Sequence, residues 1–494
     1  MSDRGTGTKE ENLDPADWEA VRVLGRQMVD EMIEHLRTVG DRPVWRPLPE
    51  ELPRQFQGPV PRSPGRLDEI YARFKKDVLP YPTGNAHPRF WGWVMGNGTV
   101  TGMLAEMLAA GYNPNMGGLA QAGNLVELQV IAWCREMFGF PAGASGLLLS
   151  GGSMANLVGL TVARNARAGF DIRAEGVAGA PKPLRFYASV EAHSSVQRGV
   201  ELLGLGHKAL RLVRTRPDFT IDTAALREAI REDRAAGCLP VCLVGCAGTV
   251  NTGAIDPLDE LADICREENL WFHVDGAFGA LAALSPELRP CLKGMERADS
   301  LAFDMHKWMY LPYEVGCTLV RDAEAHRAAF TLTPHYLEHT PRGIGGSDFW
   351  FSDYGVQLSR GFRALKVWMA LQEYGTEKLG RLVLQNVQQA RYLRGLVEST
   401  KGLELAADVP LNIVCLRYRG SLTDPPAIDA LNRELLLRLH EGGVAAPSYT
   451  VIDGTFALRV CITNHRSTRD DFDILIREVL RLGKALEAEG VPRG

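Results

Sequence analysis

The chain has 494 residues, of which 45% are hydrophobic and 23% are charged, and its formal net charge is −5. This length and composition predict a soluble globular protein with two or three domains. The slightly acidic balance excludes the basic surface typical of nucleic-acid-binding proteins. No run approaches the roughly 20 apolar residues of a membrane span, and the polar N-terminus has no signal-peptide core. We therefore expect a cytoplasmic protein that binds neither nucleic acid nor membrane.

The N-terminal part is predicted to be helical and to mediate dimerisation. Residues 1–13 are polar and are expected to be disordered, and a helical period with one apolar stripe runs through residues 14–39. A Pro-rich linker (42–64) and a second helix (67–78) follow. The long apolar stripe would be exposed on a monomer. We therefore expect a homodimer in which a partner subunit covers the stripe, with residues 1–85 as the dimerisation segment.

From Phe140 onward, short apolar runs alternate with amphipathic segments. This alternation predicts an α/β domain, residues 86–375, with a mostly parallel central sheet covered by helices on both faces. Asp222 is a plausible N-cap for one of the helices. The predicted strands are 146–150, 184–189, 210–213, 239–247 and 270–275, and the predicted helices are 153–168, 194–203, 223–236 and 257–269.

After Gly375 the composition becomes rich in leucine and arginine. A long helix (378–398) is predicted first, and a second helix (427–441) then separates two short strands, 412–418 and 456–462. Residues 376–494 are therefore predicted to form a small C-terminal α+β domain.

The nine cysteines do not form a recognisable disulfide or metal pattern. Cys238, Cys242 and Cys246 recur every four residues, but they belong to an apolar run that is typical of a strand. On a strand, residues four apart are separated by about 13 Å, which is too far for one ion to bind two of them. We expect buried, small apolar side chains and no metal site.

Two short apolar runs end abruptly in polar groups that suit pyridoxal 5′-phosphate. Residues 271–275 end at Asp275, and residues 299–304 are followed by His306 and Lys307. In enzymes that use this cofactor, a lysine forms the internal Schiff base and a carboxylate keeps the pyridine nitrogen protonated. The two strand ends therefore predict a pyridoxal-phosphate site in which Lys307 and Asp275 take these roles.

Two further segments supply possible contacts to that cofactor. Residues 150–153 (SGGS) link a strand to a helix, and a glycine-rich helix N-terminus can bind a phosphate, although a tight turn alone would have the same sequence. His193 also follows a strand and could stack on the pyridine ring, or else serve as a cap or core residue. His306 could ligate a metal, but no third donor lies near it in the sequence.

Together these segments resemble the group II pyridoxal-dependent decarboxylases, which include the aromatic-L-amino-acid, tyrosine, histidine and glutamate decarboxylases. The resemblance extends from about His87 to Gly375 and more thinly to the C-terminus. The segments that carry it, in the family's order, are 87–93 (HPRFWGW), 191–196 (EAHSSV), 253–257 (GAIDP), 273–277 (HVDGA) and 306–308 (HKW).

The resemblance implies a fold-type I architecture, like that of aspartate aminotransferase, and a homodimer with active sites at the interface. It implies that Lys307 carries the Schiff base, that Asp275 pairs with the pyridine nitrogen, and that His193 stacks on the ring. It further implies that a loop tyrosine, Tyr336, returns a proton to the substrate carbon. The remaining cofactor contacts that it implies are Gly152, Ser153, Ala277, Ser300, Asp304 and His306.

The function that this resemblance implies is decarboxylation of an L-amino acid, with an aromatic side chain favoured, to the amine and carbon dioxide. Tyr336 and His193 are both present, which favours this outcome over the aldehyde-forming branch of the family. Residues 113–124 depart from the family pattern, so another amino acid, or an oxidative or carbon–carbon-cleaving reaction, is the alternative. A non-enzymatic descendant that binds partners is a third hypothesis.

The sequence does not identify the side chain of the amino-acid substrate. Phe90, Trp91 and Trp93 could line a pocket for an aromatic ring, or they could belong to the core. Arg89 and Arg342 could bind a side-chain carboxylate, but nothing in the sequence singles them out.

Overall fold

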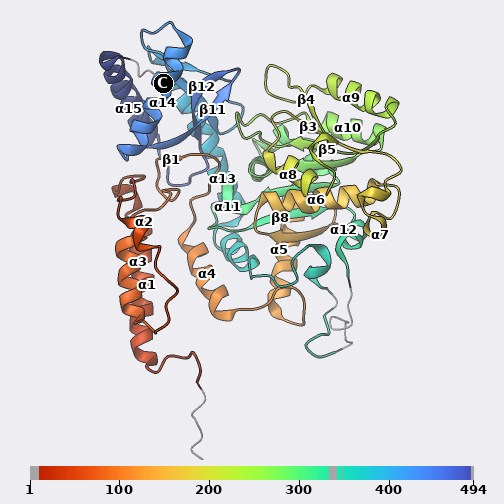
Figure 1. Ribbon diagram of the computed structural model, residues 1–494, viewed down its shortest axis with the longest axis horizontal. Helices are drawn as coiled ribbons and strands as arrows, with labels where there is room; N and C mark the ends of the chain where they lie inside the picture. The colour runs from red at the N-terminus through yellow and green to blue at the C-terminus, as the bar shows by residue number, and fades with distance from the viewer. Residues whose placement is uncertain (1–10, 333–341, 348, 491–494) are drawn as a thin grey trace, which may run out of the picture. The chain divides into compact units, whose positions relative to one another are not determined.

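The computed structural model describes residues 11–332, 342–347 and 349–490 (Figure 1). The chain divides into two compact units, of which the first comprises residues 1–42 and 47–82 and the second comprises residues 43–46 and 83–494. The division close to residue 82 lies near the predicted boundary at residue 85.

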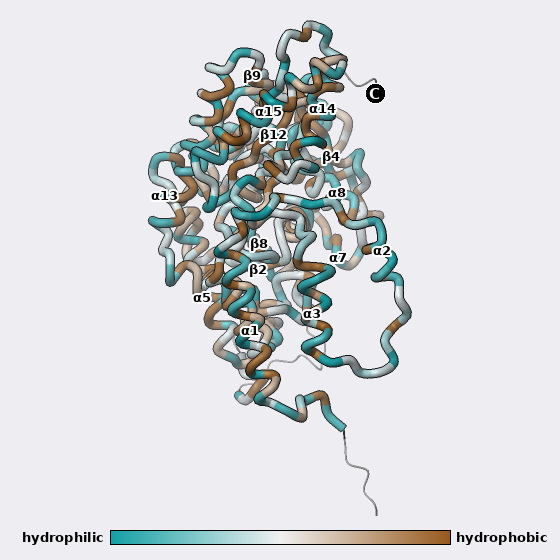
Figure 2. The backbone as a smooth tube through the Cα atoms, turned by 90° about the vertical axis from the view of Figure 1, so that its left-hand side faces the viewer, coloured by the Kyte–Doolittle hydropathy of each residue, from teal (hydrophilic) through white to brown (hydrophobic). Residues whose placement is uncertain are grey.

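The first unit is helical. Its two longer helices, α1 (Trp18–Arg37) and α3 (Leu67–Asp77), confirm the predicted helices, and the linker between them contains only the short α2 (Leu52–Gln55). Asp17 caps α1 by accepting hydrogen bonds from the amides of Glu19 and Ala20 at 3.0 Å. No residue of α1 is buried. Figure 2 shows apolar segments alternating with polar ones along α1 and α3.

The larger sheet of the second unit has seven strands in the order β2-β8-β7-β6-β5-β3-β4. Only β8 runs against its neighbours, so the sheet is mostly parallel, as predicted. The strands are β2 (Ser145–Leu149), β3 (Leu184–Ser189), β4 (Leu210–Val213), β5 (Leu239–Cys246), β6 (Trp271–Asp275), β7 (Ser300–Asp304) and β8 (Gly316–Val320).

Helices cover this sheet on both faces, because central strands such as β5 are apolar on both sides. Leu243 packs in one hydrophobic cluster together with residues of α9 and α10, whereas Cys242 and Val244 pack in another with residues of α6 and α8. The four predicted helices are thus confirmed, and Asp222 caps α9 as expected. Their bounds are α6 (Gly152–Arg167), α8 (Ser194–Leu202), α9 (Thr223–Ala235) and α10 (Leu258–Glu268).

The strand register brings three chain segments to one edge of this sheet. Leu149, the last residue of β2, and Asp304, the last residue of β7, both pair with Gly316 of β8. On the next strand, Asp275 of β6 pairs with Ala302 of β7. The start of α6, the end of β6 and the short helix α11 (Met305–Trp308) therefore meet at the carboxyl edge, where open α/β sheets bind ligands.

The second sheet contains five strands in the order β1-β11-β12-β10-β9. Its predicted strands and helix are confirmed, but it also recruits Phe90 and Trp91 as β1, which pairs in parallel with β11. Both side chains are buried, so they are core residues. The elements are β1 (Phe90–Trp91), β9 (Leu403–Leu405), β10 (Ile413–Tyr418), β11 (Ala446–Ile452), β12 (Thr455–Cys461), α14 (Pro425–Glu441) and α15 (Arg469–Glu489).

The long helix α13 (Ala364–Ser399) connects the two sheets and bends at Gly375, whose φ is +67°. The predicted division between the large and small domains falls at this bend, and it stays a prediction because both sheets belong to one compact unit. The remaining helices are α4 (Val100–Tyr112), α5 (Ala122–Phe138), α7 (Ile172–Glu175) and α12 (Ala323–Phe330). Within the described ranges, no helix is both long and apolar enough to cross a membrane.

Candidate active site

A cavity of about 430 Å³ lies at the carboxyl edge of the large sheet. Its lining residues come from two sources. The strand-end set follows strands of the sheet and consists of the lining residues 150–154, Asn156, His193, Ser195, Ala277, Asp304, His306 and Lys307, together with Asp275, the last residue of β6. The loop set comes from segments without regular structure and consists of Val94, Met95, Tyr313 and Glu314.

Lys307 is the central cation of this cavity. Its Nζ lies 2.8 Å from Oδ2 of Asp304, and its side chain is 20% exposed. Burial acts to lower the pKa of Lys307, but the carboxylates of Asp304 and Asp275 outweigh burial and raise it above the usual value. The free amine is therefore held in its charged form by its neighbours.

Glycines allow Asp304 to lie directly against the turn that begins α6. A Cβ on Gly152 would lie 2.8 Å from Oδ2 of Asp304, and a Cβ on Gly316 would lie 2.6 Å from Oδ1. Oδ1 is buried and has no hydrogen-bond partner among the described residues. An unsatisfied buried oxygen costs free energy, so this atom marks a place where a bound group can supply a donor.

Asp275 is held in one orientation at the end of β6. Its Oδ1 accepts a hydrogen bond from the amide of Ala277 at 3.1 Å, and its Oδ2 accepts one from Nδ2 of Asn156 at 2.9 Å. The same Nδ2 also donates to Oγ of Ser195 at 3.0 Å. Asn156 lies one helical turn after Gly152, so the helix that begins at the glycine turn also orients the carboxylate.

A chain of hydrogen bonds behind the cavity fixes Asn156 in turn. The indole N–H of Trp271 donates a hydrogen bond to Oγ of Ser300 at 2.8 Å. The Ser300 hydroxyl in turn donates a hydrogen bond to Nδ1 of His273 at 2.7 Å. Nε2 of His273 then donates to Oδ1 of Asn156 at 2.9 Å. Burial lowers the pKa of His273 to about 4, against the opposing effect of Asp275. This arrangement requires a neutral imidazole.

This chain of hydrogen bonds corrects one prediction. Ser300 does not line the cavity; it is the first residue of β7, whereas Asp304 at the other end of the strand lines the cavity. Its hydroxyl is engaged by Trp271 and His273. We therefore remove Ser300 from the residues expected to touch a cofactor and assign it to the supporting network.

His193 both caps a helix and lines the cavity, so the two interpretations of this residue are compatible. Its Nδ1 accepts a hydrogen bond from the amide of Ser195 at 3.2 Å and lies 2.8 Å from the Ser195 hydroxyl. Burial lowers its pKa, while Asp275 acts to raise it and Lys307 to lower it. The imidazole is thus neutral near pH 7 and available to exchange a proton.

His306 forms part of the wall of the cavity. Its Nδ1 accepts a hydrogen bond from the amide of Val315 at 3.1 Å, and its ring lies 4.4 Å from the ring of Tyr313, with an angle of 37° between the planes. Burial lowers its pKa as well. In the part of the chain that the structure describes, no group of three or more His, Cys, Asp or Glu residues could hold a metal ion.

A buried arginine without a carboxylate partner was not foreseen. Arg459 is 3% exposed, and its Nη1 donates to the carbonyl of Trp93 at 2.8 Å. Its Nη2 lacks an oxygen acceptor among the described residues. The Cys461 thiol lies within electrostatic reach of both Arg459 and Lys307. Burial raises the pKa of this thiol, whereas the two cations act to lower it. A buried cation of this kind is suited to an anionic ligand.

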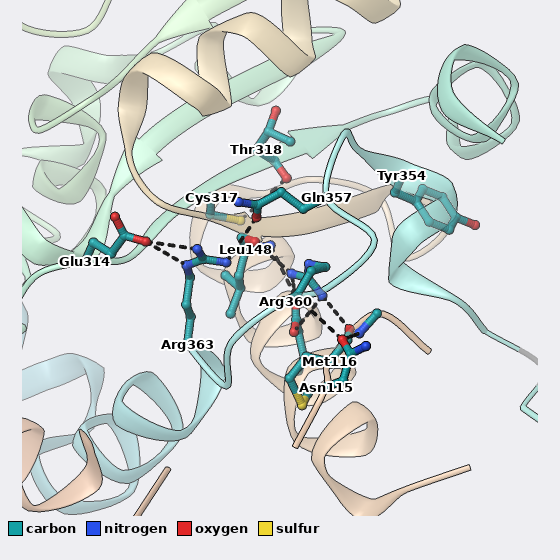
Figure 3. A network of polar contacts seen from close by, with 12 residues as sticks. Asn115, Met116, Leu148, Glu314, Cys317, Thr318, Tyr354, Gln357, Arg360 and Arg363 are labelled. Atoms are coloured by element: carbon teal, nitrogen blue, oxygen red, sulfur yellow. Dashed lines mark hydrogen bonds and ion pairs between the residues drawn. The ribbon is translucent and has the colours of Figure 1, made fainter. Parts of the chain in front are cut away.

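The divergent segment 113–124 is anchored by Arg360, and none of its residues belongs to the lining of the active cavity given above. Arg360 donates hydrogen bonds to the carbonyl of Met116 at 2.9 Å and to the carbonyl of Leu148 at 2.7 Å (Figure 3). It also forms a buried ion pair with Glu127. Asn113 and Pro114 of this segment line the cavity next to the active one.

Several residues named from the sequence lie elsewhere or outside the described part. Trp93 is largely exposed, and Arg89 is paired with Asp471 at 3.3 Å. Tyr336 lies outside the described residues. Asn156 and Ser195 were missed, although Ser195 belongs to the recognised segment 191–196 and Asn156 lies one helical turn after Gly152 of the SGGS segment. Nothing in the sequence pattern pointed to the loop set, because its residues follow no period.

The strand-end set fits pyridoxal 5′-phosphate. The first amides of α6 lack intrahelical partners and open into the cavity, where a phosphate can accept their hydrogen bonds. The oriented carboxylate of Asp275 suits a protonated pyridine nitrogen, and the buried amine of Lys307 suits an aldehyde. The space that Gly151 and Gly152 leave would be filled by any larger side chain.

Comparisons with known proteins agree with this assignment. Residues 49–419 match the family described as the pyridoxal-dependent decarboxylase conserved domain. The chain is 33% identical over 470 residues to an aromatic-L-amino-acid decarboxylase of Bacillus atrophaeus, covering 94% of this chain and 96% of that protein. It is 28% identical over 483 residues to a phenylacetaldehyde synthase of Arabidopsis thaliana, covering 94% and 97%. The crystal structure of Oryza sativa TDC with PLP and tryptamine superimposes with a TM-score of 0.88 at 26% identity, covering 96% of this chain and 100% of that chain.

Proposed function

Because the chain belongs to the pyridoxal-dependent decarboxylase family, we propose that it converts an aromatic L-amino acid to the corresponding amine and carbon dioxide. The cofactor of the family is pyridoxal 5′-phosphate. The observation that carries the proposal is the placement of Lys307 and an oriented Asp275 at one edge of the sheet, beside the open start of α6. An aromatic substrate is supported by the similarity to an aromatic-L-amino-acid decarboxylase.

In this proposal the strand-end set holds the cofactor. The amides of Gly152 and Ser153 would take the phosphate, Asp275 would pair with the pyridine nitrogen, and Ala277 would pack on the ring. Lys307 would bind the aldehyde carbon through Nζ, with Asp304 next to it and His306 in the wall. When bound, pyridoxal 5′-phosphate supplies a ring that accepts the electron pair left by the departing carboxylate.

Other residues of the chain would orient the substrate and move its proton. Arg459 has an unpaired Nη2 and is the candidate for the substrate carboxylate, which it would hold until carbon dioxide leaves. His193 lines the cavity, and Asp275 and Lys307 both influence its lowered pKa, so it is suited to exchange a proton with the substrate carbon. Tyr336 remains the predicted second donor, from the segment that the structure does not describe.

We also propose that the protein is a cytoplasmic homodimer with its active sites at the interface. Trp18 on α1 is 62% exposed, and the apolar residues Val23, Leu67 and Ile70 of the same unit are also exposed, so a second copy would cover them. All nine cysteines are free, which suits a reducing compartment. Sedimentation equilibrium should give twice the chain mass, and a monomer mass would contradict the dimer.

The proposed reaction is tested by incubating the cofactor-loaded protein with pooled L-amino acids and identifying all products by mass spectrometry. We expect an aromatic amine, with carbon dioxide in equal amount. Aldehyde together with hydrogen peroxide would instead support the alternative outcome, which the similarity to a phenylacetaldehyde synthase also makes worth testing. No turnover of any aromatic amino acid would overturn the proposal.

A further inference from the structure

Tyr313 and Glu314 form a wall between two cavities. One is the active cavity, and the other is a neighbouring cavity of about 360 Å³ that is lined by Glu106, Asn113, Phe362, Arg363 and Lys366, among others. The ring of Tyr313 is fixed against His306, the residue before Lys307. Glu314 therefore follows directly on a residue that is packed beside the catalytic lysine, and its backbone position is defined.

Glu314 is held on one side only. Nη2 and Nε of Arg363 donate to it at 2.9 and 3.3 Å, and both hydrogen bonds fall on the same oxygen, Oε1 (Figure 3). The side chain of Arg363 is 13% exposed, whereas that of Glu314 is 51% exposed. Oε2 of Glu314 has no hydrogen-bond partner among the described residues.

The other charges of the neighbouring cavity leave this second oxygen available. The ammonium group of Lys366 is paired with Glu106 and donates to the carbonyl of Pro312 at 3.1 Å. Burial lowers the pKa of Lys366, an effect that Glu106 opposes. The nearest cations are thus already engaged, and Oε2 is an anchored acceptor that can only receive a hydrogen bond.

We propose that Glu314 determines substrate specificity by accepting a hydrogen bond on Oε2 from an N–H or O–H group on the aromatic ring of the substrate. This inference rests on the proposed function and deepens it. Phenol, indole and imidazole rings carry such a donor, whereas an unsubstituted phenyl ring does not. A ring without a donor would leave the carboxylate oxygen desolvated and unpaired.

The test compares two pairs of substrates in which one member carries a ring donor and the other lacks it; N-methylation of the indole also adds bulk, so the phenol pair is the primary comparison. The loaded enzyme is assayed with L-tyrosine against L-phenylalanine and with L-tryptophan against 1-methyl-L-tryptophan. We expect kcat/KM to favour the donor of each pair about tenfold, as for one hydrogen bond to a charged, partly exposed group. Glu314→Gln, which keeps the length but removes the charge, and Glu314→Met, which removes the acceptor, should both lower this preference. Glu314→Met should also raise kcat/KM for phenylalanine, because no carboxylate is then left without a partner.

The matched control is Glu228→Gln, which removes an exposed carboxylate on α9 that lines neither of the two cavities. It should leave both preferences as they are. A second readout without turnover is the dissociation constant of tyramine against phenethylamine, measured by calorimetry, which should show the same loss of discrimination in the two Glu314 variants.

The possible outcomes separate the two proposals. If the variants still decarboxylate aromatic amino acids with an unchanged preference, Glu314 is not the acceptor, and the proposed function stands. An equal fall for all four substrates would also overturn the inference, because Glu314 would then only position Arg363. If the wild-type enzyme decarboxylates none of the four, the proposed function fails, and the inference fails with it.

Discussion

The strand-end set and the loop set line the same cavity but are built differently. The strand-end residues follow regular elements of the large sheet, and its central side chains hold one another, as Asn156 holds Asp275 and His273 holds Asn156. Tyr313 and Glu314 instead lie on an irregular segment and are each fixed by one contact, with His306 and Arg363 respectively. The strand-end set is therefore the more rigid of the two and is suited to hold the cofactor, whereas the loop set can adapt more easily to a substrate.

The largest effect that this comparison predicts is at Lys307. Lys307→Ala removes the amine that is paired with Asp304, and it should lower kcat by about 10⁴-fold or more, since the group acts directly on the reacting centre. Lys293→Ala, a change at an exposed lysine, is the control and should have wild-type activity. Measurable decarboxylation above about 1% of wild type in Lys307→Ala would remove this residue from its role.

The next effect concerns the charge of Asp275. Asp275→Asn keeps the shape but removes the carboxylate, so we expect kcat to fall by about 10²- to 10³-fold and cofactor to dissociate more readily. Asp263→Asn, at an exposed position on α10, should change neither quantity. If the two variants had equal kcat, the ring nitrogen would not depend on Asp275, and the strand-end set would lose its central anion.

Acidification should weaken the strand-end set through His273. The pKa of this buried imidazole is about 4 in the folded protein, below the usual 6.5, so the unfolded chain binds more protons at intermediate pH. The stability that the neutral ring contributes is complete above about pH 6.5 and is lost as the pH falls toward 4. At pH 5 the loss is roughly 2 kcal/mol.

The check on this pH effect is the melting temperature of the cofactor-free protein at pH 7 and pH 5. His273→Gln cannot titrate, so its melting temperature should fall less over this interval than that of the wild type. An identical fall in both proteins would mean that His273 is not the group that couples pH to the hydrogen-bond chain behind the cavity.

The smallest effect is predicted in the loop set. Tyr313→Phe keeps the ring that packs on His306 and removes only the hydroxyl, so cofactor retention should be unchanged and kcat/KM should change by less than about threefold. Cofactor absorbance after gel filtration measures retention. A loss of cofactor in Tyr313→Phe would show that the loop set also holds the cofactor, and it would weaken the contrast between the two sets.

The sequence was most informative where the backbone is regular. Asp275 and Lys307 were recognised because each follows an apolar strand, and the carboxyl ends of parallel strands meet at one edge. Ser300 was misplaced because the family resemblance places residues near a cofactor without saying at which end of β7 they lie. Glu314 was not recognised at all, since its importance depends on Arg363, which is 49 residues away in the chain.

Some structural features also depend on long-range contacts. β1 is only two residues long and exists because Phe90 and Trp91 pair with β11, which the sequence did not mark as a strand. The sequence also did not show that a kink at Gly375 joins two helical stretches into α13, at the position where a domain boundary stays a prediction. In both cases tertiary packing decides the outcome, and a single sequence records it weakly.

The most direct test of the central claim, that the strand ends of the large sheet hold the cofactor through Lys307, is to reduce the cofactor-loaded protein with borohydride and map the modified peptide by mass spectrometry. The account predicts that the cofactor becomes fixed to Lys307, in the peptide that contains His306 and Trp308. Attachment to a different lysine, or no attachment to the intact, loaded protein, would contradict it.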